Sequence, residues 1–133
     1  MADTIHTKIE FFQDEGGKAS TDSGYTVNIL GGENSARPYE LLFMALASCL
    51  YSTFEDVYKK KRLSCDSVSV EISGEKREEV PKFLKVCDVK FTVKAADKQS
   101  GFEKSFELAC KYCSIYQTVT MVAEMRPVIL FID

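Results

Sequence analysis

The chain has 133 residues, of which 45% are apolar and 28% are charged, and its formal net charge is −3. This length predicts a single domain over residues 1–133, and the composition argues against disorder. The mild negative charge indicates neither a nucleic acid nor a membrane as a partner. Five cysteines and the absence of a signal-peptide pattern are typical of thiols in a reducing compartment, so we expect a cytoplasmic protein.

The N-terminal third is predicted to be a meander of short strands. Loose alternation and β-branched or aromatic residues over Thr4–Phe12 predict one strand, and Tyr25–Leu30 predicts another. Between them, Asp14–Gly17 is predicted to be a turn, because its paired glycines tolerate positive φ angles.

A long helix is predicted from Pro38 to about Lys61, since proline suits a first helical turn and no further Gly or Pro follows. The first half of this helix is apolar on nearly every side, and its apolar run over residues 41–50 is too short to span a bilayer. A helix that is apolar all round is buried all round. In so small a domain we expect either a wrapped sheet or a second subunit to cover it.

The C-terminal half is predicted to contain two paired strands, a second helix and a closing strand. Period-two alternation indicates strands over Ser67–Lys76 and Phe83–Ala95, which we expect to pair as a hairpin. A helix is expected from Phe102 or Glu103, with Cys110 and Cys113 on one stripe, followed by a strand over Val128–Ile132. This order of elements predicts an α+β domain.

The polar residues exclude several mechanisms. His6 is the only histidine and lies near the chain end, which disfavours a Cys–His pair. Only Cys110 and Cys113 have a paired spacing, so we expect neither a metal nor a cofactor. Their CxxC spacing also lies about two turns inside the predicted helix, away from the helix N-terminus that lowers a thiol pKa. Cys65, Cys87 and Cys110 are assigned to packing. From the residues alone, Cys49 is either a packed core cysteine or a reactive thiol.

Two motifs carry a resemblance to a known family. The first is Pro38, Glu40–Leu42 and Ala45–Cys49 at the start of the long helix, and the second is Ala109 with Tyr112–Ser114. With a separation of 64 residues between Cys49 and Cys113, the chain resembles the OsmC/Ohr family of osmotically inducible and organic-hydroperoxide-resistance proteins. The pattern is more similar to a poorly characterised OsmC-like branch than to the well-defined peroxidases.

The resemblance implies an α+β OsmC-like fold, with antiparallel sheets wrapped around a long central helix in an intertwined homodimer. It also implies a thiol-dependent peroxidase of the oxidative or osmotic stress response, acting on organic hydroperoxides. Cys49 is expected to become a sulfenic acid, and Cys113 is expected to condense with it to a disulfide. An external lipoyl-type dithiol would then reduce the pair.

Candidate activating and binding residues follow from the same resemblance. The family places an acidic residue directly after the helix-opening proline and an arginine on the early strands. Here Tyr39 follows Pro38, the acid is Glu40, and no arginine precedes Arg37. Glu40 and Arg37 are therefore the candidate activators of Cys49. The expected substrate-binding residues are aromatic: Tyr39, Phe43, Tyr112 and Tyr116.

Two alternatives to the enzyme stay open. The first is a non-catalytic dimer that binds a small apolar or acyl ligand and uses the cysteines structurally. The second is a redox sensor that forms the same Cys49–Cys113 disulfide. Turnover with a dithiol distinguishes the enzyme from the binding protein, and a partner contact that changes on oxidation identifies the sensor.

Overall fold

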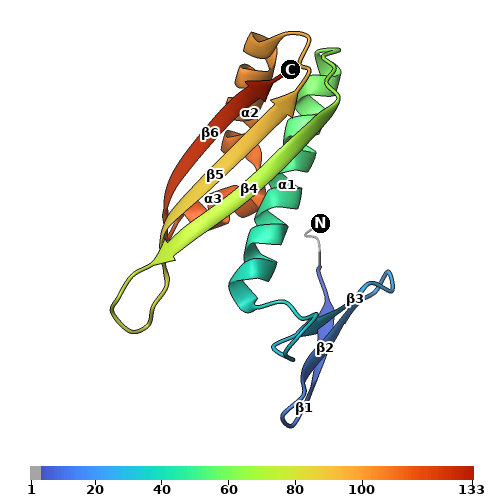
Figure 1. Ribbon diagram of the computed structural model, residues 1–133, viewed down its shortest axis with the longest axis vertical. Coiled ribbons are helices and arrows are strands. Elements are labelled where there is room, and N and C mark those ends of the chain that lie inside the picture. The colour runs from blue at the N-terminus through green and yellow to red at the C-terminus, as the bar shows by residue number, and fades with distance from the viewer. Residues whose placement is uncertain (1–3) are drawn as a thin grey trace. The chain divides into compact units, whose positions relative to one another are not determined.

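The computed structural model describes residues 4–133, which form two compact units (Figure 1). The first unit ends at Leu42, and the second runs from Phe43 to Asp133. Strands and helices are mixed in the order β1–β2–β3–α1–β4–β5–α2–α3–β6. The α+β class predicted from the sequence is therefore confirmed.

The N-terminal unit contains a three-stranded antiparallel sheet of β1 (Thr7–Phe12), β2 (Gly16–Thr21) and β3 (Thr26–Ile29). The first and last of these lie within the predicted strands. The prediction of a turn over Asp14–Gly17 was wrong for the two glycines, which begin β2. The chain reverses one step earlier, where Asp14 has a φ of 64°.

The two faces of this sheet differ in polarity. Ile9, Ala19 and Val27 are aligned across the three strands, and Phe11, Gly17 and Ile29 form the next row on the same face. Ile9 is 41% exposed and Phe11 is 60% exposed, so apolar side chains on this face are open to solvent. The opposite face carries lysine and other polar side chains: Lys8, Glu10, Lys18, Ser20, Thr26 and Asn28.

Helix α1 spans Pro38–Lys60, close to its predicted limits. Its buried side chains recur every four residues along one stripe: Leu46, Leu50, Phe54 and Tyr58. Met44 lies off this stripe and is 60% exposed. Throughout residues 4–133, no helix combines the length and the hydropathy that crossing a bilayer requires.

The C-terminal unit is built on a second sheet, β4 (Ser67–Lys76), β5 (Leu84–Lys94) and β6 (Glu124–Ile132), in that order. β4 and β5 form the predicted antiparallel hairpin. β6 pairs parallel to β5, so the expectation of antiparallel sheets was wrong for this pair. A parallel pair needs a crossover connection, and here α2 (Gln99–Tyr112) and α3 (Ser114–Thr120) supply it. Figure 1 shows the helices together on one face of this sheet.

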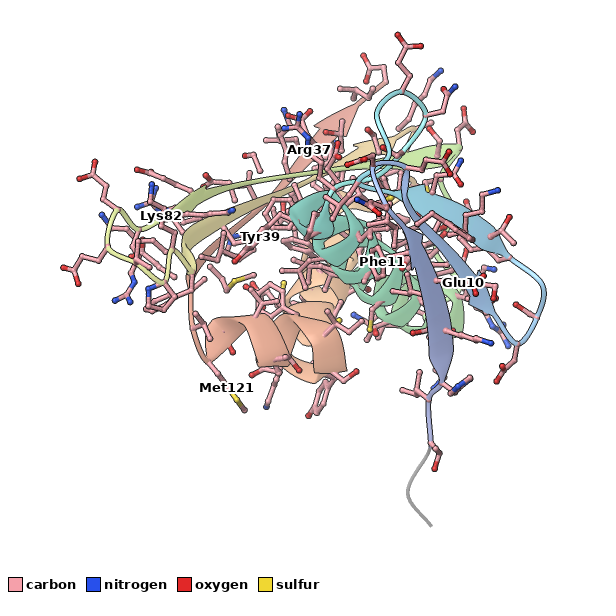
Figure 2. The ribbon with its side chains drawn as sticks, turned by 90° about the horizontal axis from the view of Figure 1, so that it is seen from below. Glu10, Phe11, Arg37, Tyr39, Lys82 and Met121 are labelled. Atoms are coloured by element: carbon pink, nitrogen blue, oxygen red, sulfur yellow. The ribbon has the colours of Figure 1, made fainter. Side chains whose placement is uncertain are left out.

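An aromatic cluster fills the space between the C-terminal sheet and its helices. The ring centroid of Phe54 lies 5.2 Å from that of Phe91 and 6.0 Å from that of Phe102, and the Phe91 and Phe106 rings are 4.8 Å apart. Phe54, Phe91 and Phe102 are fully buried. The cluster therefore packs α1 and α2 against the same sheet, which fixes where their cysteines lie. In contrast, Met121 at the end of α3 projects outward and is 84% exposed (Figure 2).

Candidate functional site

Cys49 and Cys113 meet within the C-terminal unit. Their sulfur atoms lie 3.2 Å apart although the residues are 64 positions apart in the chain. Cys49 is half-buried on α1, next to the buried Leu50, whereas Cys113 has no exposed surface. The structure therefore brings together the two thiols that the sequence analysis selected, with one accessible and the other enclosed.

A break between two helices places the buried thiol. The sequence analysis predicted Cys113 inside a continuous helix, but α2 ends at Tyr112, and Cys113 adopts an extended conformation with φ −68° and ψ 118°. Its backbone N–H donates to the Ala109 carbonyl at 2.8 Å. Its sulfur accepts a hydrogen bond from the Tyr116 N–H at 3.4 Å. Cys113 thus closes α2 and caps α3, as a polar N-cap side chain does.

The environment of Cys49 favours its ionised form. Burial raises the pKa of this thiol, but hydrogen bonds from the Ile115 backbone, from the Cys113 thiol and from Ser114 outweigh burial and lower it below its usual range. The Ser114 hydroxyl lies 3.9 Å from the Cys49 sulfur. Hydrogen bonds to a charged form favour that form. Cys49 therefore has the character of a nucleophile.

The environment of Cys113 has the opposite effect. Burial raises the pKa of Cys113, and its proximity to Cys49 raises it further, although hydrogen bonds from the Tyr116 and Ile115 backbones oppose the rise. At neutral pH, Cys113 is therefore the protonated partner that donates to Cys49. A thiol with a lowered pKa in contact with a protonated thiol is the arrangement that a sulfenic acid and disulfide cycle requires.

The other cysteines have the properties of packing residues. Burial raises the pKa of Cys65, of Cys87 and of Cys110, the last to about 11. The Cys110 thiol is hydrogen-bonded to the hydroxyl of Tyr116. Among residues 4–133, no three His, Cys, Asp or Glu side chains are grouped so as to hold a metal ion.

Three predicted site residues belong to the N-terminal unit. Arg37 and Glu40 are exposed and Tyr39 is half-buried. A Glu40 carboxylate oxygen accepts a hydrogen bond from the Arg37 backbone N–H at 2.8 Å. This contact is the glutamate half of a capping box, which satisfies a free N–H at the start of α1.

The remaining predicted residues belong to the C-terminal unit and differ in exposure. Tyr116 is buried beside Cys113, whereas Tyr112 is 65% exposed with the Lys111 ammonium 5.4 Å from its ring centroid. Phe43 is half-buried against Gly74, where an added Cβ would lie 2.8 Å from the ring. Tyr116 contacts the thiol pair, because its backbone N–H donates to the Cys113 sulfur.

Apart from Cys113, the groups that contact Cys49 were not predicted from the sequence. Ser114 and Ile115 open α3, and both interact with the Cys49 sulfur. The only signal was the hydroxyl residue directly after Cys113. It had no assigned role because the helix was expected to continue through this point.

Comparisons with known proteins agree with the fold. Residues 31–125, which include both site cysteines, match the family model of the OsmC-like protein. Protein YhfA of Escherichia coli (strain K12) is 27% identical over 97 residues, which cover 70% of this chain and 72% of YhfA.

Solved structures resemble the chain over nearly its whole length. An OsmC-like protein from Mycoplasma pneumoniae has a TM-score of 0.86 at 12% identity and covers 100% of both chains. The organic hydroperoxide resistance protein OhrB of Bacillus subtilis has a TM-score of 0.66 at 16% identity, covering 94% of this chain and 98% of its own. These TM-scores establish a shared fold. The match to the family model over residues 31–125 shows that the chain belongs to the OsmC-like protein family.

Proposed function

We propose that the protein is a thiol-dependent peroxidase that reduces organic hydroperoxides through Cys49 and Cys113. The observation that carries this proposal is the 3.2 Å contact between their sulfur atoms, with the pKa of Cys49 lowered and that of Cys113 raised. The OsmC-like family match and the fold shared with organic hydroperoxide resistance proteins support it.

The reaction proceeds in two balanced steps. The Cys49 thiolate attacks the terminal oxygen of the hydroperoxide, the O–O bond breaks, and the alkoxide leaves and takes a proton from water. Cys49 is then a sulfenic acid. The sulfur of Cys113 attacks it, water leaves, and a Cys49–Cys113 disulfide forms. Because the two sulfur atoms start 3.2 Å apart, only a small movement is needed to reach bonding distance.

An external lipoyl-type dithiol completes the proposed cycle. Cys49 is half-buried and Cys113 is fully buried, so access favours attack of the dithiol on the Cys49 sulfur, with Cys113 as the leaving thiol. A cycle that needs a dithiol reductant suits a reducing compartment, and we place the protein in the cytoplasm, in the response to oxidative or osmotic stress.

The predicted activating and binding residues are part of the proposed site. Glu40 and Arg37 are the proposed activators of Cys49. An apolar wall would favour organic peroxides over hydrogen peroxide, and the residues proposed to form it are Tyr39, Phe43, Tyr112 and Tyr116. The single OsmC-like domain over residues 1–133 is part of the same proposal.

The proposed assembly is a homodimer. The apolar face of the N-terminal sheet is open to solvent, with Phe11 60% exposed and Tyr25 64% exposed. Met44 is also exposed on the apolar half of α1. Exposed apolar surface of this kind is typical of an interface, and a second copy of the chain is the occupant proposed here.

A second candidate function is a non-catalytic dimer that binds a small apolar or acyl ligand. An apolar hollow of about 210 Å³ on the N-terminal unit favours it. Ile9, Val27, Ile29 and Leu41 are among the residues that line this hollow. A redox sensor would use the same disulfide and would differ only in changing a partner contact on oxidation.

Titration of the reduced protein with cumene hydroperoxide tests the peroxidase. Free thiols and intact mass are followed for the parent protein and for Cys49→Ser and Cys113→Ser in parallel. We expect a fast loss of two thiols in the parent, with a mass change equal to two hydrogen atoms, and no fast phase in Cys49→Ser. Slow thiol loss that is unaffected by Cys49→Ser would refute the peroxidase and leave the ligand-binding dimer.

A further inference from the structure

We propose that the hydroxyl group of Ser114 is the side-chain donor that stabilises the Cys49 thiolate. This inference rests on the proposed function, because it concerns the reacting sulfur atom of that cycle. It assigns to a neutral residue a task that the family resemblance gives to an arginine. No arginine precedes Arg37 in this chain.

The helix break at Cys113 sets the position of Ser114. Because Cys113 is extended, the chain changes direction between α2 and α3, and Ser114 becomes the first residue of α3. Its hydroxyl oxygen then lies 3.9 Å from the Cys49 sulfur. The same helix break brings the Cys113 sulfur to 3.2 Å from the Cys49 sulfur. In a continuous helix, Cys113 and Ser114 would point about 100° apart around the axis. The break is therefore what allows both side chains to contact Cys49.

The distance fits a donor that tightens when the thiol ionises. At 3.9 Å the contact is long, as expected between two neutral groups. A charged acceptor draws its donors closer and strengthens the bond. Hydrogen bonds in catalytic sites are often long in the protein without substrate and shorten only during the reaction.

The groups that lower the pKa of Cys49 most, and so stabilise its ionised form, are neutral. They are the Ile115 backbone N–H, the Cys113 thiol, and the backbone and hydroxyl of Ser114. Of the two side chains, Cys113 is consumed when the disulfide forms. Ser114 keeps its proton throughout, so it can hold the thiolate before each turnover without taking part in the bond changes.

The effect of removing the hydroxyl depends on pH in a way that a structural role would not reproduce. Loss of a donor to a charged group lowers the thiolate fraction by about tenfold where the thiol is mostly protonated. The remaining thiolate becomes more basic, and its nucleophilicity rises by about threefold. In Ser114→Ala we therefore expect the reaction of Cys49 to be about threefold slower below the pKa of the parent thiol and about threefold faster above the pKa of the variant thiol.

The measurement is the rate of alkylation of Cys49 by iodoacetamide from about pH 5 to pH 10, resolved by peptide mass spectrometry. Ser114→Thr keeps a hydroxyl and should retain the parent profile. Ser48→Ala is the matched control, because the Ser48 hydroxyl lies beside Cys49 in sequence but donates to the Ala45 carbonyl at 3.1 Å. Thermal unfolding of each variant verifies that the fold is intact.

The outcomes separate this inference from the peroxidase proposal. The Ser114 donor is supported when the plots of alkylation rate against pH for the parent and Ser114→Ala cross, and when Ser114→Thr and Ser48→Ala follow the parent. Profiles for the parent and Ser114→Ala that coincide, or a Ser48→Ala profile that shifts equally, would overturn it. Alkylation uses no peroxide, so a crossing without consumption of cumene hydroperoxide would contradict the peroxidase alone.

Discussion

The two units of the chain use apolar side chains in opposite ways. In the C-terminal unit, aromatic rings pack on one another and Phe54, Phe91 and Phe102 have no exposed surface. In the N-terminal unit, Phe11 keeps 60% of its surface exposed. Burial of aromatic rings stabilises the C-terminal unit, whereas the open apolar face of the N-terminal sheet leaves apolar surface in contact with water. The thiol pair therefore lies in the unit whose apolar side chains form a buried core.

The largest effect is expected from removing the centre of the C-terminal core. Phe54→Ala deletes a fully buried ring that contacts Tyr58, Phe91, Phe102 and Phe106. We expect the free energy of unfolding to fall by about 3–5 kcal/mol, measured by urea denaturation. Met121→Ala removes an exposed side chain and should change it by less than about 0.5 kcal/mol. Equal effects of the two variants would contradict the buried aromatic core of the C-terminal unit.

A smaller effect is expected at the open face of the N-terminal sheet. Phe11→Ser removes an exposed ring, and if a second copy covers this face, the dimer loses about 1.5–3 kcal/mol of apolar burial. Analytical ultracentrifugation should then show a dissociation constant raised by about tenfold or more. Lys18→Ala alters the opposite face and should leave it unchanged. A parent protein that is monomeric at high concentration would refute the dimer.

The next comparison lies within the C-terminal unit, between two half-buried thiols. The pKa of Cys49 is lowered, and that of Cys110 is raised to about 11. The thiolate is the reactive form, so a lower pKa keeps a thiol reactive at lower pH. Near pH 7, we expect iodoacetamide to alkylate Cys49 at least about tenfold faster than Cys110. Similar rates at the two positions would show that hydrogen bonding does not activate Cys49.

The smallest effect is expected at the start of α1. Glu40→Gln keeps the side-chain shape but weakens the hydrogen bond to the Arg37 backbone and removes a charge from the positive end of the helix. We expect a loss of about 0.3–1 kcal/mol in the free energy of unfolding, with Glu33→Gln in the preceding loop as the control. A shift in the pH profile of Cys49 alkylation would support the proposed role of Glu40 as an activator, and an unchanged profile would contradict that role.

Helix α1 and the hairpin of β4 and β5 could be predicted because their signals are local. Pro38 opens α1, and no Gly or Pro interrupts it before its last residue, Lys60. β4 occupies the predicted range, Ser67–Lys76, because one face is half-buried and the alternation is regular. In both cases, the residues that determine the element lie inside it.

Strand β2 could not be predicted from its own composition. A Cβ at Gly17 would lie 2.7 Å from the Phe11 ring, so glycine is required by a residue on the neighbouring strand. From the sequence alone, two consecutive glycines indicate a turn, because the contact between Gly17 and the Phe11 ring is not visible there. The actual turn places Asp14 at positive φ, where Asp and Asn are tolerated better than most residues.

At the candidate site, the pairing of the two thiols was predicted, and the roles of the other proposed residues stay predictions. Cys49 and Cys113 were selected through the family resemblance, and the structure places their sulfur atoms in contact. No Gly or Pro marks the helix break at Cys113. The break accompanies a long-range contact between the Cys113 sulfur and Cys49 on α1, which local sequence does not reveal. The position of Ser114 depends on that break, so its contact with Cys49 could not be anticipated either.

The distance along the chain between the two thiols has a thermodynamic consequence. A disulfide joining residues 64 positions apart would tie together a loop that contains β4, β5 and α2. Such a cross-link removes chain entropy from the unfolded state worth about 4 kcal/mol. By the closure of the thermodynamic cycle, folding stabilises that disulfide by the same amount. The oxidised C-terminal unit would therefore be harder to unfold than the reduced one, and the dithiol that resets it would work against the stability of the fold.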